Sequence, residues 1–448
     1  MEILIKTLQL VLSLSILVVL HELGHFIPAK LFKTRVEKFY LFFDPWFSLF
    51  KVNKGETEYG IGWLPLGGYV KISGMIDESI DKEQMKLPAQ PWEFRAKPSW
   101  QRLIIMIGGV TVNVILAMAI YSMVAFCWGD KYLPNDNLTD GIWCADSIAY
   151  EMGFKNGDKI LSVDGKKPDD FRKIFLDIIL NEAQAVEVLR DGEKITLPMS
   201  THLTKEILKK KASVIQARMP FEVAAFSDSS VAKKAGFLER DRLVGINEIP
   251  IKYFDQYKSE IGKHKGESVS FSLMRGKQLV SITLQIPADG ILGIWNRNFG
   301  VEDYEKEGIY QIKTVSYTMM QSIPAGISRA SSTLDNYIKQ FKLLFSRETE
   351  GYKQIGGFLT IGSLFSPMWD WQHFWEMTAF LSIILAFMNI LPIPALDGGH
   401  VMFLLYEMIF RRKPNEKFIE YAQMAGMAVL FALLIYANGN DILRLFTK

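Results

Sequence analysis

Four long apolar segments constrain the fold of this chain more than any other feature of its sequence. They lie within residues 1–32, 101–128, 374–408 and 420–440. About 20 consecutive apolar residues cross a bilayer as a helix, because a helix satisfies its own backbone hydrogen bonds. The first segment ends in HELGHF rather than in small residues, and its apolar run is too long for a signal peptide. We therefore predict a polytopic α-helical membrane protein with four transmembrane helices.

The composition adds a water-exposed part to this membrane part. Apolar residues make up 49% of the 448 residues, yet 22% are charged, which is too many for a chain that lies wholly in lipid. The net charge of +2 gives no reason to expect a nucleic-acid partner. The two cysteines, Cys127 and Cys144, exclude a disulfide framework and a thiolate metal site, and the sequence leaves open whether they pair.

Basic residues near the ends of the spans predict their orientation. Lys and Arg gather after the first span, before the second, and between the third and the fourth. Such residues accumulate on the cytoplasmic side of a membrane. Both termini and the long segment between the second and third spans are therefore expected on the extracytoplasmic side.

This extracytoplasmic segment contains a tandem repeat. Residues 151–171 match residues 234–254 at an offset of 83, and strand-like runs follow each copy. The two implied modules, 130–205 and 215–288, resemble PDZ domains of bacterial proteases, which bind extended peptides at a sheet edge. The alternative is a pair of spacers that only select substrates by size.

Two features of the segment depart from a plain repeat. The second module has Arg240 and Glu248 at turns where the first has glycine. A connector over 291–372 follows, with an amphipathic helix around 320–346. This helix either lies on the membrane face or is a plain packing helix.

The first span carries the motif His21-Glu22-Leu23-Gly24-His25. On a helix, positions i and i+4 share one face, so the two imidazoles can hold one Zn²⁺ while Glu22 acts as a general base. Ionisable residues within a spanning helix are functional candidates by default. The alternative is a pair of core histidines that bond backbone carbonyls.

The third span offers the missing metal ligand. A catalytic zinc usually takes three protein ligands, and Asp397 is an acidic residue in an otherwise apolar stretch loosened by prolines and glycines. His400 lies three residues further on and is a rival ligand.

HELGH, the stretch NILPIPALDGGH (389–400) and the PDZ-like insert together resemble the site-2 protease family of intramembrane zinc metalloproteases, in particular its bacterial sigma-E-regulating branch. The resemblance covers nearly the whole chain. It implies that His21, His25 and Asp397 bind zinc and that Glu22 is the catalytic base. It further implies that Asn389, Pro392 and Pro394 help to hold the substrate strand.

Residues 33–100 add a β-hairpin region to this resemblance. The stretch 57–74 predicts alternating strands, and Gly67, Gly68 and Tyr69 match the family's membrane-dipping hairpin. An open sheet edge there would bind an unwound substrate as an added strand. The alternative is a cytoplasmic surface hairpin.

The sequence departs from the family pattern at two places. Val110 replaces a proline early in the second span, and Phe43-Asp44-Pro45 only approximates Phe-Gly-Pro. Neither departure touches the expected zinc ligands.

By resemblance, the substrates are single-span membrane proteins, such as anti-sigma factors, and signal-peptide remnants. The protein is expected in the bacterial inner membrane, with the PDZ-like modules and both termini in the periplasm.

Two other functions are alternatives to a metalloprotease. A membrane adaptor with a structural metal would need a closed set of four ligands, but only three good ligands are visible. A metal transporter would need further ionisable residues along a path through the membrane, which the second and fourth spans lack.

Overall fold

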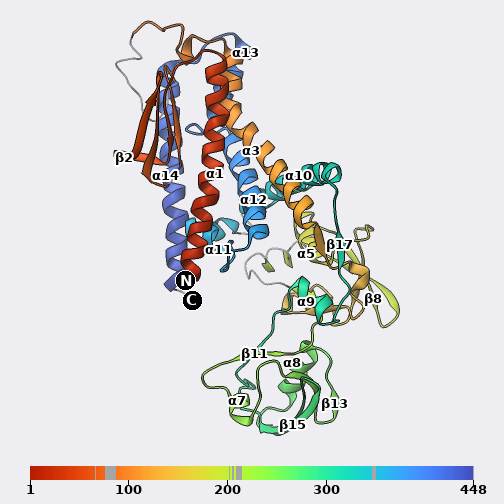
Figure 1. Ribbon diagram of the computed structural model, residues 1–448. Coiled ribbons are helices and arrows are strands. Elements are labelled where there is room, and N and C mark those ends of the chain that lie inside the picture. The colour runs from red at the N-terminus through yellow and green to blue at the C-terminus, as the bar shows by residue number, and fades with distance from the viewer. Residues whose placement is uncertain are drawn as a thin grey trace. The chain divides into compact units, whose positions relative to one another are not determined.

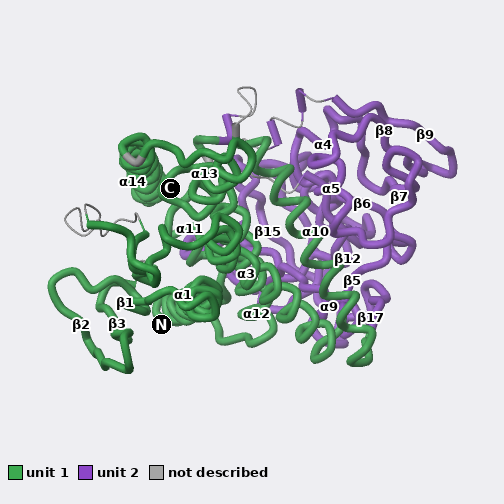
Figure 2. The backbone as a smooth tube through the Cα atoms, turned by 90° about the horizontal axis from the view of Figure 1, so that it is seen from above, with its two compact units in different colours: residues 1–129, 316–345, 352–448 green, residues 130–315, 346–351 purple. Residues whose placement is uncertain are grey.

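A computed structural model describes residues 1–65, 67–75, 87–200, 202–203, 206–207, 214–345 and 350–446. Parts of the predicted segments 33–100, 130–205 and 291–372 lie outside this description. The chain forms two compact units (Figure 2). The helical unit comprises residues 1–129, 316–345 and 352–448, and the β-rich unit comprises 130–315 and 346–351.

The described residues of the helical unit contain four helices that are long and apolar enough to cross a membrane. They are α1 (Glu2–Leu31), α3 (Ser99–Trp128), α12 (Trp371–Ile390) and α14 (Glu416–Phe446). Helix α3 packs against α1 and α12, and also against α10 (Met319–Phe345) and α13 (Asp397–Phe410). Helix α1 begins and α14 ends at the same end of this unit (Figure 1).

Glycines and small polar residues allow the helices to approach closely. A Cβ atom on Gly24 of α1 would lie 2.4 Å from the carbonyl oxygen of Gly108 on α3, so these two backbones touch. Buried hydroxyls link helices as well: Thr378 Oγ1 donates to Ser13 Oγ at 3.0 Å, and Ser382 Oγ donates to the Asn113 carbonyl at 2.8 Å. Small residues and interhelical hydrogen bonds stabilise helix pairs where no hydrophobic effect operates.

The third apolar segment differs from a continuous span. The sequence predicts one transmembrane helix over 374–408, whereas α12 ends at Ile390 and α13 begins at Asp397. Two of the intervening residues are prolines, which cannot donate a helical hydrogen bond, and Ala395 adopts a positive φ of 84°. The break therefore places Asp397 in the first turn of a new helix.

A four-stranded sheet lies beside α1 (Figure 1). Its strands are β1 (Val36–Leu41), β2 (Phe43–Lys54), β3 (Thr57–Leu64) and β4 (Tyr69–Ile72). The order is β2-β3-β1-β4, with β1 parallel to β3 and antiparallel to β4. Strand β4 is therefore an edge strand.

The β-rich unit repeats one arrangement of elements twice. The first copy consists of α4 (Ser147–Glu151), β7 (Lys159–Val163), α5 (Phe171–Leu180), β8 (Ala185–Arg190) and β9 (Glu193–Pro198). The second consists of α7 (Val231–Ala235), β12 (Arg242–Ile246), α8 (Phe254–Lys263), β14 (Ser268–Arg275) and β15 (Gln278–Gln285). The first sheet has the order β7-β8-β9, and the second has β13-β12-β14-β15, with β13 (Ile249–Pro250) at its edge.

An ion pair between an arginine and a fully buried aspartate occurs at the same place in each copy. Arg190 bonds both carboxylate oxygens of Asp158 at 2.7 Å and also the Gly153 carbonyl. In the second copy, Arg275 bonds both oxygens of Asp241, at 2.8 and 2.7 Å, and the carbonyl of Gly236. The two copies thus share the same arginine, aspartate and glycine-carbonyl contacts.

The second copy also keeps the turn geometry without its glycines. Gly157 and Gly165 have φ values of 94° and 73°, and Arg240 and Glu248 at the corresponding positions have 67° and 69°. Both turns therefore persist, at a conformational cost of about 1 kcal/mol or more for each non-glycine residue.

Shorter elements complete the description. Three strand pairs join distant parts of the β-rich unit: β5 (Asp130–Tyr132) with β17 (Lys313–Val315), β6 (Ile142–Cys144) with β10 (Ile215–Ala217), and β11 (Val223–Phe226) with β16 (Ile294–Asn296). Two more helices have described bounds, α9 (Val301–Lys306) and α11 (Phe358–Ser363), and 3-10 turns lie at Phe94–Ala96, Asn135–Asn137 and Gly351–Gln354. Helix α10 buries Ala330 against α3 and exposes Met319 and Met320.

Both cysteines are free thiols. Burial raises the pKa of Cys144 to about 12, so this thiol stays protonated and unreactive at neutral pH.

Candidate active site

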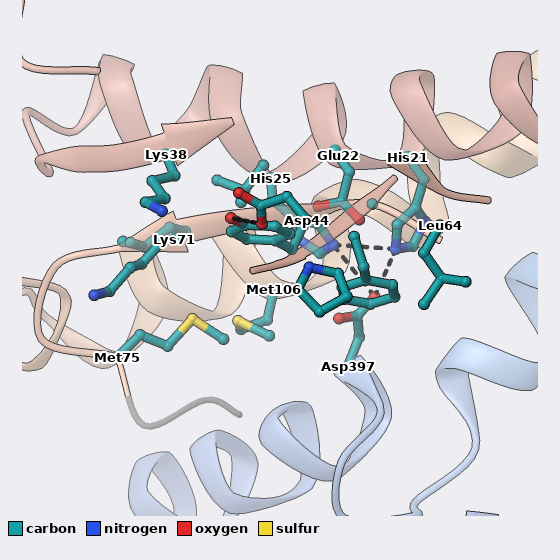
Figure 3. Close-up of a pocket in the computed structure, with 16 residues that line it drawn as sticks. His21, Glu22, His25, Lys38, Asp44, Leu64, Lys71, Met75, Met106 and Asp397 are labelled. Carbon is teal, nitrogen blue, oxygen red and sulfur yellow. Dashed lines mark hydrogen bonds and ion pairs between the residues drawn. The ribbon is translucent and has the colours of Figure 1, made fainter. Parts of the chain in front are cut away.

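A cavity of about 750 Å³ in the helical unit brings the predicted metal ligands together (Figure 3). Helix α1 supplies His21, Glu22 and His25, and the first turn of α13 supplies Asp397. The rest of the wall comes mainly from the four-stranded sheet and the segments beside it.

Three ligand atoms form an equilateral triangle. His21 Nε2, His25 Nε2 and Asp397 Oδ2 lie 3.3 Å from one another in all three pairs. Tetrahedral ligands held about 2.0 Å from zinc are themselves about 3.3 Å apart. Asp397 Oδ2 is buried and accepts no hydrogen bond from the described residues. The donor set and its spacing therefore fit a zinc ion with one coordination position left for water or substrate.

The imidazole of His25 is held in the tautomer that zinc requires. Its Nδ1 lies 2.8 Å from the carbonyl oxygen of Ile105, which can only accept a hydrogen bond. The proton therefore sits on Nδ1, and the Nε2 lone pair points toward His21 and Asp397. Such a carbonyl contact is the usual orienting contact of a metal-binding histidine.

Asn113 of α3 orients the His21 ring in the way that the Ile105 carbonyl orients the His25 ring. Its side-chain amide lies 3.0 Å from His21 Nδ1 and is fully buried. With Nδ2 toward the ring, Asn113 Oδ1 has no hydrogen-bond partner among the described residues. In the opposite amide orientation, Oδ1 accepts the Nδ1 proton of His21, which leaves His21 Nε2 as the metal-binding nitrogen. Sequence reasoning gave Asn113 no role, although a polar residue within an apolar span was the available signal.

Glu22 lies between the two histidines with its carboxylate directed into the cavity (Figure 3). It is not one of the three clustered ligands. Two glycines leave room around these side chains. A Cβ on Gly109 would lie 2.4 Å from His25 Nε2, and one on Gly68 would lie 3.5 Å from Glu22 Cγ.

The predicted substrate-binding residues divide into two groups. Gly68 and Tyr69 line the cavity, and Asn389 places its Nδ2 3.2 Å from His21 Nε2. Gly67 has a φ of 142° and lies against the Phe43 ring. Pro392 and Pro394 lie in the break between α12 and α13, and neither lines the cavity.

The rival ligand His400 lies away from the cluster. Its Nε2 is 3.1 Å from Gln423 Nε2, and it lines a separate small cavity. The described part of the chain therefore groups Asp397, and not His400, with the two histidines.

The sheet also contributes Asp44, for which the sequence predicted no role in the site. Asp44 lines the cavity and accepts hydrogen bonds from Tyr69 Oη at 2.9 Å and from Ser48 Oγ at 3.0 Å. Tyr69 also stacks on Tyr40 and Phe43. Burial and the bond to Asp44 raise the pKa of Tyr69, so the phenol remains a donor. The unusual Phe-Asp-Pro sequence was the signal for Asp44.

Two histidines, a carboxylate and a free glutamate among membrane-length helices define a membrane metalloprotease. The sequence model of peptidase family M50 matches residues 9–433, and the chain belongs to this family. It is 26% identical to a "Putative zinc metalloprotease" of Vibrio cholerae, over 99% of this chain and 100% of that protein. It is 28% identical to a protein of the same description in Neisseria meningitidis, over 98% of this chain and 99% of that protein. It is also 26% identical to the "Metalloprotease MmpA" of Caulobacter vibrioides over 98% of this chain and 96% of the relative. The protein is a zinc metalloprotease.

Proposed function

We propose that this protein is an intramembrane protease that hydrolyses peptide bonds in or near the transmembrane segments of single-span proteins. Anti-sigma factors and signal-peptide remnants are the substrates that the resemblance implies, and regulated intramembrane proteolysis is the process. The observation that carries the proposal is the 3.3 Å triangle of ligand atoms beside Glu22, built partly on a helix of membrane-spanning length.

His21, His25 and Asp397 would hold the zinc ion. When bound, zinc polarises the scissile carbonyl and makes water a nucleophile at neutral pH. Glu22 takes the proton from the attacking water and delivers it to the leaving amine. Asn389, whose amide nitrogen lies 3.2 Å from His21 Nε2, would donate to a substrate carbonyl.

Substrate must be unwound before it can be cut, because the hydrogen bonds of a helix bury its peptide bonds. Among the described strands, β4 lies at the edge of its sheet, where its backbone would pair with an extended segment. Gly68 leads into this strand next to Glu22, so a segment added to β4 lies beside the general base. Tyr69 is fixed by Asp44 and stiffens the start of the strand.

The proposed setting is a bacterial inner membrane with both termini and the β-rich unit in the periplasm. The shared position of the two termini at one end of the helical unit supports an even number of crossings (Figure 1). The two repeated modules would bind extended peptides, or exclude substrates that still carry a bulky exported domain.

Cleavage of a tagged single-span peptide by the purified protein tests the proposal. The wild type should cut it, a zinc chelator should abolish cutting, and Glu22→Gln should lower kcat at least about 100-fold while bound zinc stays unchanged. The matched control is Glu56→Gln, an exposed glutamate at the β2–β3 turn, which should retain full activity. Loss of zinc from Glu22→Gln would argue against a general base, and undiminished cutting by that variant would refute the mechanism.

A further inference from the structure

Two lysines face the active-site cavity from adjacent strands. Lys38 on β1 and Lys71 on β4 are direct cross-strand partners, and both line the cavity. Their ammonium groups extend together at the end of the cavity away from His21 (Figure 3). Like charges placed directly opposite each other destabilise a sheet. The protein therefore places two positive charges side by side at the wall of its catalytic cavity.

The lysines have acidic neighbours, but those neighbours do not form the wall. Lys71 Nζ lies 3.2 Å from Glu37 and Lys38 Nζ lies 3.6 Å from Glu58, and neither glutamate is among the residues that line the cavity. Other bonds hold both glutamates: Ser73 Oγ donates to Glu37 at 2.7 Å, and Tyr40 Oη donates to Glu58 at 2.8 Å. Among the described residues, the two ammonium groups are thus the charges that line this end of the cavity.

A β-bulge lies next to the two lysines and supports a role for their side chains in ligand binding. The pairing of β1 with β4 shifts register between Val36 and Lys38, which leaves Glu37 as an extra residue. Bulges change the direction of side chains and are common beside active sites. The side chains of Lys38 and Lys71 remain 38% and 26% exposed, so both can move to meet a ligand.

The position of the two lysines relative to Glu22 predicts which substrate residue would lie beside them. Gly68 lies against Glu22, and Lys71 is three residues further along the edge. At about 3.3 Å per residue, Lys71 lies roughly 10 Å from the point where a substrate strand passes Glu22. Asp44, the other charged group of the sheet that lines the cavity, bonds Tyr69 and so lies nearer to that point.

We propose that Lys38 and Lys71 form a subsite for an acidic side chain about three residues from the cleaved bond. This proposal rests on the proposed function and names a class of substrate for it. The ammonium pair binds the substrate carboxylate, while Asp44 repels an acidic residue placed closer to the cleaved bond.

A peptide series tests the subsite. A single Glu is moved through the five positions on each side of the cleaved bond of a single-span peptide, and each peptide is compared with its Gln counterpart. The purified full-length protein should cleave the Glu peptide with a kcat/KM roughly 3- to 10-fold higher than the Gln peptide at the third position on one side. The assay is run in zwitterionic bilayers and repeated with anionic lipid.

Three variants sharpen the test. Combining Lys38→Gln with Lys71→Gln should bring the Glu-to-Gln ratio to about 1. Lys71→Glu should make a Lys peptide the better substrate at the same position. The control, Lys51→Gln on the exposed face of β2, should leave the ratio unchanged.

Three results would overturn the inference. One is a ratio near 1 at every position while the Gln peptides are still cleaved. Another is that the double lysine variant loses the same fraction of kcat/KM with every peptide, and only in anionic bilayers. That result would assign the lysines to binding of lipid phosphates. Absence of cleavage of any peptide by the wild type would refute the proposed function itself.

Discussion

The contact between Asn113 and His21 makes a prediction about zinc affinity. Asn113→Ala removes the only side-chain amide at His21 Nδ1 among the described contacts, at a distance of 3.0 Å. Loss of such an orienting partner typically lowers metal affinity 10- to 100-fold. At about 1.4 kcal/mol per factor of ten, this corresponds to roughly 1.4 to 2.8 kcal/mol. We expect activity at limiting zinc to fall by the same factor and to recover when zinc is in excess.

Zinc competition with a chromophoric chelator, on protein purified in detergent, measures this change directly. Asn113→Asp keeps an acceptor at His21 Nδ1 and should retain most of the affinity. The matched control is Ser382→Ala, because the Ser382 hydroxyl donates to the Asn113 backbone carbonyl and touches neither imidazole. Ser382→Ala should therefore weaken helix pairing without changing zinc affinity.

Zinc binding by Asn113→Ala as tight as that of the wild type would refute the orienting role of Asn113. An equal loss of affinity in Ser382→Ala would also refute it, because the effect would then come from helix packing. Recovery by Asn113→Asp distinguishes an orienting hydrogen bond from a general loss of structure.

Three further predictions follow from other contacts. Gly109→Ala should abolish zinc binding, measured by bound-metal analysis, because its Cβ would lie 2.4 Å from His25 Nε2. Tyr69→Phe should lower kcat/KM about 3- to 10-fold through loss of the bond to Asp44, and its pH-rate profile up to pH 10 should parallel that of the wild type, because the pKa of Tyr69 is raised above its ordinary value. Arg190→Met should destabilise the first repeated module by about 3 kcal/mol, because it leaves the Asp158 carboxylate buried without its cation, and hydrogen exchange in β7 and β8 should rise accordingly. Unchanged zinc content, an unchanged kcat/KM or unchanged exchange, respectively, would contradict them.

The sequence was informative wherever one local pattern determined one local structure. The i, i+4 spacing of His21 and His25 needs only a helix, and α1 supplies it. The repeat at an offset of 83 likewise predicted two copies of one arrangement, and α5 and α8 begin 83 residues apart, at Phe171 and Phe254. A family resemblance to PDZ domains goes beyond what these elements alone establish.

The sequence was less informative where structure depends on contacts between distant segments. The break between α12 and α13 could be suspected from prolines, but its bounds depend on how Asp397 meets α1. The contacts of Asn113 and Asp44 join residues that are 92 and 25 positions from their partners, so no local period reveals them. The edge position of β4 also depends on sheet order, which hairpin signals do not give.

Close backbone packing explains why a three-ligand site can form from separate helices. Short side chains such as Asp reach a metal only if their helices approach closely, and glycine allows that approach. Gly24 and Gly108 bring α1 against α3, and a Cβ on Gly398 would lie 2.1 Å from the Leu391 carbonyl in the break before α13. The ligand spacing is therefore set by the backbones rather than by flexible side chains. This predicts that Gly24→Ala disrupts zinc binding although Gly24 contributes no ligand, whereas Gly439→Ala on α14, where a Cβ would meet nothing within 4 Å, leaves it intact. Equal zinc affinity in the two variants would show that the helices can separate without moving the ligands.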